Sequence, residues 1–149
     1  NMKPKLYLND SRADHRGKVT FTNEFDLTKA VRTYKVSNEK IRTVRAWHGH
    51  KLEEKWISVE EGEYLICAVK VNDFEKPNKK QKIYKFTMNS DSGILHIPCN
   101  FANGAMNFTK KNSIRYFSSL KLEQSKDDDF RFDSRYWDPW SEFNPNLYE

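Results

Sequence analysis

The sequence predicts an all-β protein with the strands arranged as a sandwich or barrel. Strand-sized segments recur along most of the chain, at about the ten-residue spacing typical of such folds. Val, Ile, Tyr, Phe and Thr are frequent in these segments, and clusters of Asn, Ser, Asp, Gly and Lys separate them. The length of 149 residues favours a single domain spanning 1–149, and 37% hydrophobic residues are enough for a packed core.

Each strand is expected where an apolar or alternating run is bounded by turn residues. The nine predicted strands are 18–21, 31–36, 41–47, 55–59, 64–71, 82–88, 94–97, 105–108 and 113–117. Residues 22–30 fit a helix capped by Thr22 or a further strand equally well.

The chain changes character after Glu123, where a segment rich in charged and aromatic residues runs up to Trp140. So many aromatic side chains need to be buried, since exposed apolar surface of this size is unfavourable. We therefore expect residues 124–149 to pack back onto the barrel as a C-terminal segment of the same domain.

Charge and composition argue against several classes of partner. The net charge is +5, but the basic residues alternate with acidic ones along the chain. The acidic run 127–129 would repel a phosphate backbone, so we expect no nucleic-acid partner. No apolar run approaches the length of a membrane span, and we expect no membrane partner. Cys67 and Cys99 lack metal-site spacing and are expected to be reduced thiols in a cytoplasmic protein.

Two histidines, His48 and His50, stand two residues apart on a predicted strand and therefore share one face. Regular alternation would turn Val44, Ala46, His48 and His50 inward. A His-x-His pair followed by a Glu is typical of metal-binding cupins, but Asn103 stands where the last imidazole ligand would be expected. We therefore predict a cupin-like barrel that holds no metal.

Four motifs, in this order, carry a resemblance to a known family. They are D-H-R-G-K-V-T-F at 14–21, R-A-W-H-G-H at 45–50, K-W-I-S-V-E-E-G at 55–62 and I-P-C-N-F-A-N-G at 97–104. Over residues 14–140 the chain resembles the dTDP-4-keto-6-deoxyglucose 3,5-epimerases (dTDP-4-dehydrorhamnose 3,5-epimerases). The resemblance implies a cupin-type double-stranded β-helix, or jelly-roll barrel, that works as a homodimer with exchanged strands and without a cofactor.

The resemblance also implies an activity, epimerisation of a nucleotide-diphosphate-linked 4-keto-6-deoxy sugar for cell-surface polysaccharide biosynthesis. His48 matches the catalytic base, Lys55 the lysine near the keto oxygen, and Tyr116 the tyrosine acid. Arg16 and Arg45 match arginines that hold the diphosphate and the sugar.

The carboxylate that partners His48 is expected in the run 127–129, where Asp128 and Asp129 are the candidates, with Asp133 as an alternative. The chain departs from the family at several pocket positions, which leaves the sugar and the number of epimerised carbons open. These positions are Ala46, His50, Lys70, Asn103 and Leu122, of which His50 and Asn103 are expected to bind substrate.

The chemistry of a ketone supports the same choice of residues. A C–H bond beside a ketone becomes acidic only when a base, a cation near the oxygen and a proton donor act together. Three other functions stay open: a 3,4-ketoisomerase with His50 as a second base, a non-catalytic sugar-binding barrel if Tyr116 points away from His48, and a metal-dependent cupin.

Overall fold

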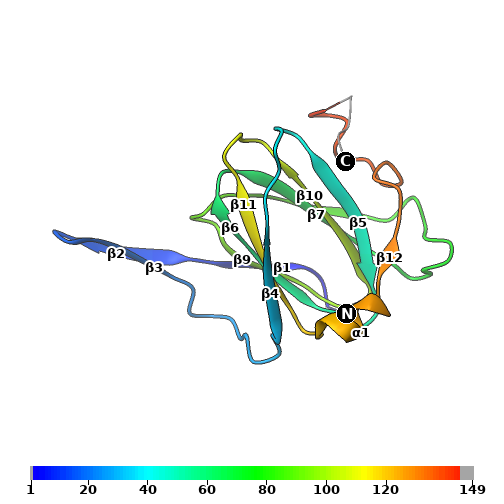
Figure 1. The fold of residues 1–149 in the computed structure, drawn as a ribbon, viewed down its shortest axis with the longest axis horizontal. Helices are drawn as coiled ribbons and strands as arrows, with labels where there is room; N and C mark the ends of the chain where they lie inside the picture. Colours follow the sequence, from blue (N-terminus) through cyan, green and yellow to red (C-terminus); the bar gives the residue numbers. More distant parts are fainter. Residues whose placement is uncertain (1, 145–149) are drawn as a thin grey trace.

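Two five-stranded antiparallel sheets face each other and form the body of the protein, which confirms the all-β prediction (Figure 1). A computed structural model describes residues 2–144. The first sheet has the order β1 (Lys5–Leu8), β9 (Gly93–Ile97), β6 (Lys55–Glu61), β11 (Ser113–Ser118) and β4 (Arg32–Val36). The second has the order β12 (Phe130–Arg131), β5 (Val44–His50), β10 (Phe101–Asn107), β7 (Tyr64–Lys70) and β8 (Ile83–Met88).

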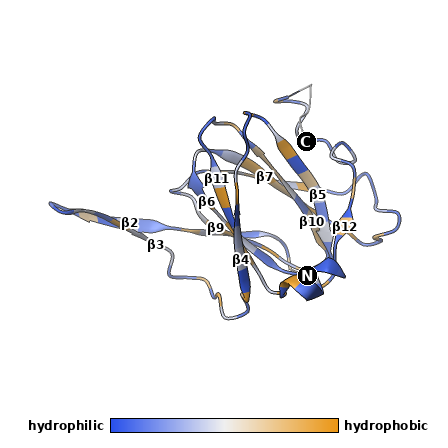
Figure 2. Ribbon diagram, viewed as in Figure 1, coloured by the Kyte–Doolittle hydropathy of each residue, from blue (hydrophilic) through white to orange (hydrophobic). Residues whose placement is uncertain are grey.

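The main hydrophobic core fills the space between the two sheets. Alternate residues of β6 and β7, such as Ile57 and Ile66, point into it and are almost fully buried. Figure 2 shows the apolar residues gathered on the strands of these two sheets. Burial of one large aliphatic side chain contributes about 1.5–3 kcal/mol, so this layer is the principal source of stability.

A second core lies on the outer face of the β12–β5–β10–β7–β8 sheet. The other residues of β7, including Cys67, pack here against Trp47, Trp137 and Trp140. The carbonyl of Ser134 accepts hydrogen bonds from the indole Nε1 of both Trp47 (3.2 Å) and Trp140 (3.1 Å). The aromatic segment after β12 therefore covers the sheet as far as residue 144, and residues 145–149 lie outside the described residues.

The strand β5 carries a bulge at its centre. Asn103 of β10 pairs with His48, and Ala105 pairs with Arg45, so Gly104 alone stands opposite both Ala46 and Trp47. A Cβ on residue 104 would lie 2.5 Å from the Cβ of Ala46, which explains the glycine.

The bulge corrects the expected alternation along β5. Val44, Ala46 and Trp47 all belong to the outer core, whereas His48 and His50 face the space between the sheets. The prediction that Val44 and Ala46 point inward is wrong, because the extra residue changes the face on which they lie.

A two-stranded hairpin, β2 (Asp10–Asp14) and β3 (Gly17–Phe21), projects far from the body (Figure 1). Its residues pair with each other and are almost all exposed. An isolated hairpin is marginally stable at best in water, so we expect this arm to be stabilised by packing against a second surface.

Each of the nine predicted strands overlaps a strand of the structure, with shifted ends. Strand β1 lies in a region with no predicted strand, and β5 begins at Val44 rather than residue 41, because Arg42 adopts a positive φ of 59° that interrupts an extended chain. Residues 22–30 form neither a helix nor a strand, and the only helix described is the short α1 (Leu122–Lys126). Within residues 2–144, no helix is long and apolar enough to cross a membrane.

Candidate active site

A cavity of about 420 Å³ opens between the two sheets, a volume within the range of small-molecule sites. Its floor contains the buried residues His50, Lys55, Asn103 and Tyr116 of β5, β6, β10 and β11. Its mouth is formed by more exposed residues of β4, α1 and the segment around β12, and by Arg45 of β5. The residues that line it are Arg32, Tyr34, Val36, Arg45, His48, His50, Glu53, Lys55, Asn103, Tyr116, Leu122, Ser125, Lys126, Asp129 and Arg131.

His48 reaches the cavity because it follows the β5 bulge directly. Burial, and then the nearby positive charge of Lys55, lower the pKa of its imidazole to about 4. His48 is therefore neutral at physiological pH and able to accept a proton. A carboxylate partner would instead raise the pKa of His48.

Lys55 and Tyr116 enter the cavity from neighbouring strands, β6 and β11. The Lys55 Nζ lies 5.4 Å from the centre of the Tyr116 ring and 5.9 Å from that of Tyr34, and the two rings stack at 5.1 Å. Burial raises the pKa of Tyr116 above its ordinary value, so its hydroxyl keeps its proton. The cavity thus holds a neutral base, an ammonium and a protonated phenol.

A buried carboxylate, Glu53, lies beneath these groups, with a side chain that is 0% exposed. Its Oε1 accepts a hydrogen bond from the Ser125 hydroxyl at 2.6 Å. Its Oε2 lies 3.9 Å from the Lys55 Nζ and 3.7 Å from Arg32 Nη2. Glu53 is therefore the counter-charge that allows an ammonium to be buried in the cavity floor.

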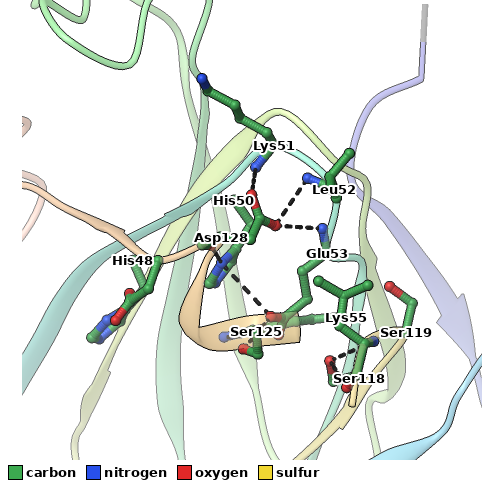
Figure 3. Close-up of polar contacts among 12 residues, drawn as sticks. His48, His50, Lys51, Leu52, Glu53, Lys55, Ser118, Ser119, Ser125 and Asp128 are labelled. Atoms are coloured by element: carbon green, nitrogen blue, oxygen red, sulfur yellow. Dashed lines mark hydrogen bonds and ion pairs between the residues drawn. The ribbon is translucent and has the colours of Figure 1, made fainter. Parts of the chain in front are cut away.

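Asp128 performs a different task from the one expected of it. Its carboxylate accepts hydrogen bonds from the backbone N–H groups of Lys51, Leu52 and Glu53 at 2.8–2.9 Å (Figure 3). Among the hydrogen bonds of residues 2–144, none joins Asp128 to His48. Asp128 instead shapes the loop after β5, which holds Glu53 in place.

The backbone of Asp128 also fixes His50. The His50 Nδ1 lies 2.7 Å from the Asp128 carbonyl oxygen, which can only accept, so Nδ1 carries the hydrogen and Nε2 carries the lone pair. That Nε2 is buried and has no hydrogen-bond partner within residues 2–144. Burial also lowers the pKa of His50, which keeps the ring neutral.

The other expected carboxylate, Asp129, lies at the cavity mouth. Its side chain pairs with Arg131 at 3.2 Å, and Arg131 stands opposite His48 in the β12–β5 ladder. Its charge favours the protonated form of His48, although burial outweighs this effect. Asp133 is absent from the cavity lining.

Of the expected substrate-binding residues, Arg45, His50 and Asn103 line the cavity, and Asn103 also donates to the His48 carbonyl at 3.4 Å. Arg16 does not line it. This residue lies at the turn of the projecting hairpin, and its guanidinium pairs with Asp14 at 2.6 Å.

One group of side chains has the composition of a metal site. Ligand atoms of His50, Glu53 and Asp128 lie within 4.8 Å of one another, and all three residues are buried. The Asp128 carboxylate already accepts three backbone hydrogen bonds. Glu53 Oε2 faces two cations, Lys55 Nζ at 3.9 Å and Arg32 Nη2 at 3.7 Å. The two neighbouring cations repel a further cation, so the group is a poor fit to a metal ion.

Several lining residues were not anticipated from the sequence: Arg32, Tyr34, Glu53, Ser125, Lys126 and Arg131. Alternation could have placed Tyr34 with Arg32 on one face of a strand, but nothing local distinguishes the inner face of β4 from its outer face. Leu122 lines the cavity from α1, whereas Lys70 is absent from the lining.

Glu53→Gln should destabilise the protein by about 3–5 kcal/mol, because it leaves the buried Lys55 ammonium without a carboxylate. Urea unfolding measures this cost. Glu60→Gln is the matched control, since Glu60 pairs with Lys35 and Arg115 at the surface and should cost less than about 1 kcal/mol. Equal unfolding midpoints for the two variants would contradict the assignment of Glu53.

The His48 ring should take up a proton only near pH 4, because burial disfavours the imidazolium ion. An NMR titration of the ring chemical shifts between pH 3.5 and 8 measures this directly. A midpoint above pH 6 would show that a carboxylate partner dominates over burial.

The structure has counterparts among solved enzymes of two activities. It matches a 3,4-ketoisomerase from Helicobacter canadensis with a TM-score of 0.68 and 18% identity, covering 91% of this chain and 96% of that one. It matches a sugar 3,4-ketoisomerase from Thermoanaerobacterium thermosaccharolyticum in complex with TDP with a TM-score of 0.66 and 19% identity, covering 94% of this chain and 96% of that one. The match to the dTDP-4-dehydrorhamnose 3,5-epimerase from Bacillus anthracis with TDP and PPi bound has a TM-score of 0.74 and 18% identity, and it covers 98% of this chain and 86% of that one.

No protein-family model and no curated protein sequence matches the chain. The resemblance predicted from the four motifs is thus confirmed at the level of the fold, which this chain shares with dTDP-sugar 3,5-epimerases and with 3,4-ketoisomerases.

Proposed function

We propose that this protein is an epimerase of a nucleotide-diphosphate-linked 4-keto-6-deoxy sugar, with its two sheets forming a cupin jelly-roll. The observation that carries the proposal is the convergence of His48, Lys55 and Tyr116, from three different strands, on one cavity. The related activities of enzymes with the same fold support it.

The proposed reaction needs three events at a carbon beside the ketone. The neutral His48 ring removes the proton from that carbon, and the electron pair moves to the ketone oxygen. Lys55 stabilises the resulting enolate by its charge, and the Tyr116 hydroxyl returns a proton to the opposite face. The phenolate and the imidazolium then exchange protons with solvent, which restores the enzyme.

The cavity charge suits the diphosphate of such a substrate. Five cationic side chains line it against two carboxylates, and the cations are Arg32, Arg45, Lys55, Lys126 and Arg131. Arginine forks bind phosphate oxygens in bidentate fashion, so Arg45 and Arg131 are the proposed diphosphate ligands. The reaction needs no cofactor, and a cytoplasmic location fits two free cysteines.

A 3,4-ketoisomerase is the second candidate, favoured by His50. This ring presents an unprotonated Nε2 two residues from His48 on the same face of β5. A second base could move a proton between neighbouring carbons. The Nε2 atom is shielded from solvent, however, so His50 must shift before it can touch a substrate. A purely sugar-binding role is disfavoured, because Tyr116 lines the same cavity as His48.

Exchange in deuterated solvent with dTDP-4-keto-6-deoxyglucose, followed by NMR, tests the mechanism. The wild type should label C3 or C5 while the ketone stays at C4. His48→Asn should abolish labelling, and Tyr116→Phe should retain labelling with little inversion. Lys55→Ala should slow both the labelling and the inversion about 10²- to 10³-fold. Migration of the ketone to C3 would identify the ketoisomerase instead.

His96→Asn is the control for His48, since His96 is buried but pairs with Glu54 away from the cavity and should keep full exchange. Tyr34→Phe is compared with Tyr116→Phe, because both tyrosines line the cavity and their rings stack. Loss of inversion only in Tyr34→Phe would transfer the acid role to Tyr34. Wild-type exchange in His48→Asn would reject the mechanism.

We further propose a homodimer in which the β2–β3 arm of one subunit packs on the other. The exposed arm, with Val19 unburied and Arg16 at its turn, cannot add Arg16 to the cavity of its own subunit. Sedimentation at micromolar concentration should show a dimer, whose interface would bury upward of about 2,000 Å². Deletion of residues 10–21 should give a monomer, and a monomeric wild type would contradict the proposal.

A further inference from the structure

Three buried asparagines form a hydrogen-bonded network at the end of the cavity where Arg45 lies. Asn38, Asn107 and Asn112 are each less than a tenth exposed. Asn38 Nδ2 donates to Asn107 Oδ1 at 2.9 Å, and the backbone N–H of Asn38 donates to Asn112 Oδ1 at 2.8 Å. Buried amides are conspicuous because each donor and acceptor must find a partner.

The backbone around this network determines which way each amide points. Asn107 Nδ2 donates to the carbonyls of Lys40 and Thr109, both at 3.0 Å, so both of its hydrogens are used. Asn107 Oδ1 must then be the acceptor facing Asn38. Asn38 consequently presents its NH₂ group to Asn107, and its Oδ1 is directed to Arg45.

Arg45 donates from Nε to this Asn38 oxygen at 2.7 Å, a short and charge-assisted hydrogen bond. Among residues 2–144, no carboxylate lies in ion-pair distance of Arg45. Because Asn38 engages only Nε, the two terminal nitrogens of the guanidinium remain for a ligand in the cavity that Arg45 lines.

We propose that Asn38 is a positioning residue that holds Arg45 ready for the diphosphate of the substrate. An arginine loses much side-chain freedom when it binds a ligand, and a neighbour that fixes it beforehand reduces that loss. A carboxylate in the place of Asn38 would fix the side chain as well but would also neutralise it. A neutral amide leaves the full positive charge for the ligand. This proposal rests on the proposed function, which supplies the diphosphate.

Binding of TDP, measured by calorimetry, tests the proposal in a double-mutant cycle. Asn38→Ala should weaken binding about three- to tenfold, because Arg45 loses its fixed orientation. Arg45→Ala should weaken it more. In the Arg45→Ala background, Asn38→Ala should change the affinity less than about twofold, since the residue through which Asn38 acts is gone.

The network should tolerate Asn38→Ala. Asn107 Oδ1 still accepts from the backbone N–H of Thr43 at 3.1 Å, and the Asn38 backbone still pairs with Asn112. Thr43→Ala is the matched control, because it removes a hydrogen bond to the Lys40 carbonyl in the same loop without touching Arg45. Its affinity for TDP should equal that of the wild type.

An NMR measurement without ligand separates this proposal from the proposed function. The Arg45 Nε–H signal should be protected from solvent exchange in the wild type and in Thr43→Ala, and lost in Asn38→Ala. Failure of the wild type to bind TDP, with the signal protected, would reject the proposed function. Equal, additive effects of Asn38→Ala in both backgrounds, or an unprotected signal in the wild type, would overturn the role of Asn38.

Discussion

The bulge in β5 is the constraint on which the rest of the structure depends. With one extra residue opposite Gly104, Trp47 turns to the outer face and His48 to the inner face within a single step of the chain. The outer tryptophan anchors the C-terminal segment through the Ser134 and Trp137 carbonyls. The inner histidine enters the cavity. One irregularity thus builds both the second core and the proposed base.

The C-terminal segment, once anchored, completes the site from the other side. It pairs with β5 as β12, which places Arg131 and Asp129 at the cavity mouth, and it carries Asp128 to the loop at 51–53. Asp128 fixes that loop, the loop fixes Glu53, and Glu53 balances the charge of Lys55. The charges of the cavity are therefore organised by backbone hydrogen bonds more than by direct pairing of catalytic groups.

Strongly patterned strands such as β7 and β11 could be predicted to within a few residues, because β-branched and aromatic side chains there alternate or run unbroken between clear turns. The bulge could not, since its cause is the close approach of Gly104 from a strand distant in sequence. The motifs pointed to His48, Lys55 and Tyr116, and all three line the cavity. The task of Asp128 was missed, because three consecutive aspartates look alike until the backbone groups they meet are known.

The electrostatics of the cavity keep the proposed base neutral before it takes up a proton. A base that must start neutral is favoured by burial and by a nearby cation, and His48 has both. In the proposed reaction the same cation, Lys55, stabilises the enolate that proton removal creates, while it disfavours the imidazolium that forms at the same time. Glu53 lies beneath Lys55 and is fully buried, which keeps its negative charge away from the cavity space where the enolate would form. In the proposed reaction, the excess of cationic side chains along the cavity lining, with the carboxylate of Glu53 buried below them, favours the negative charge that develops on the ketone oxygen.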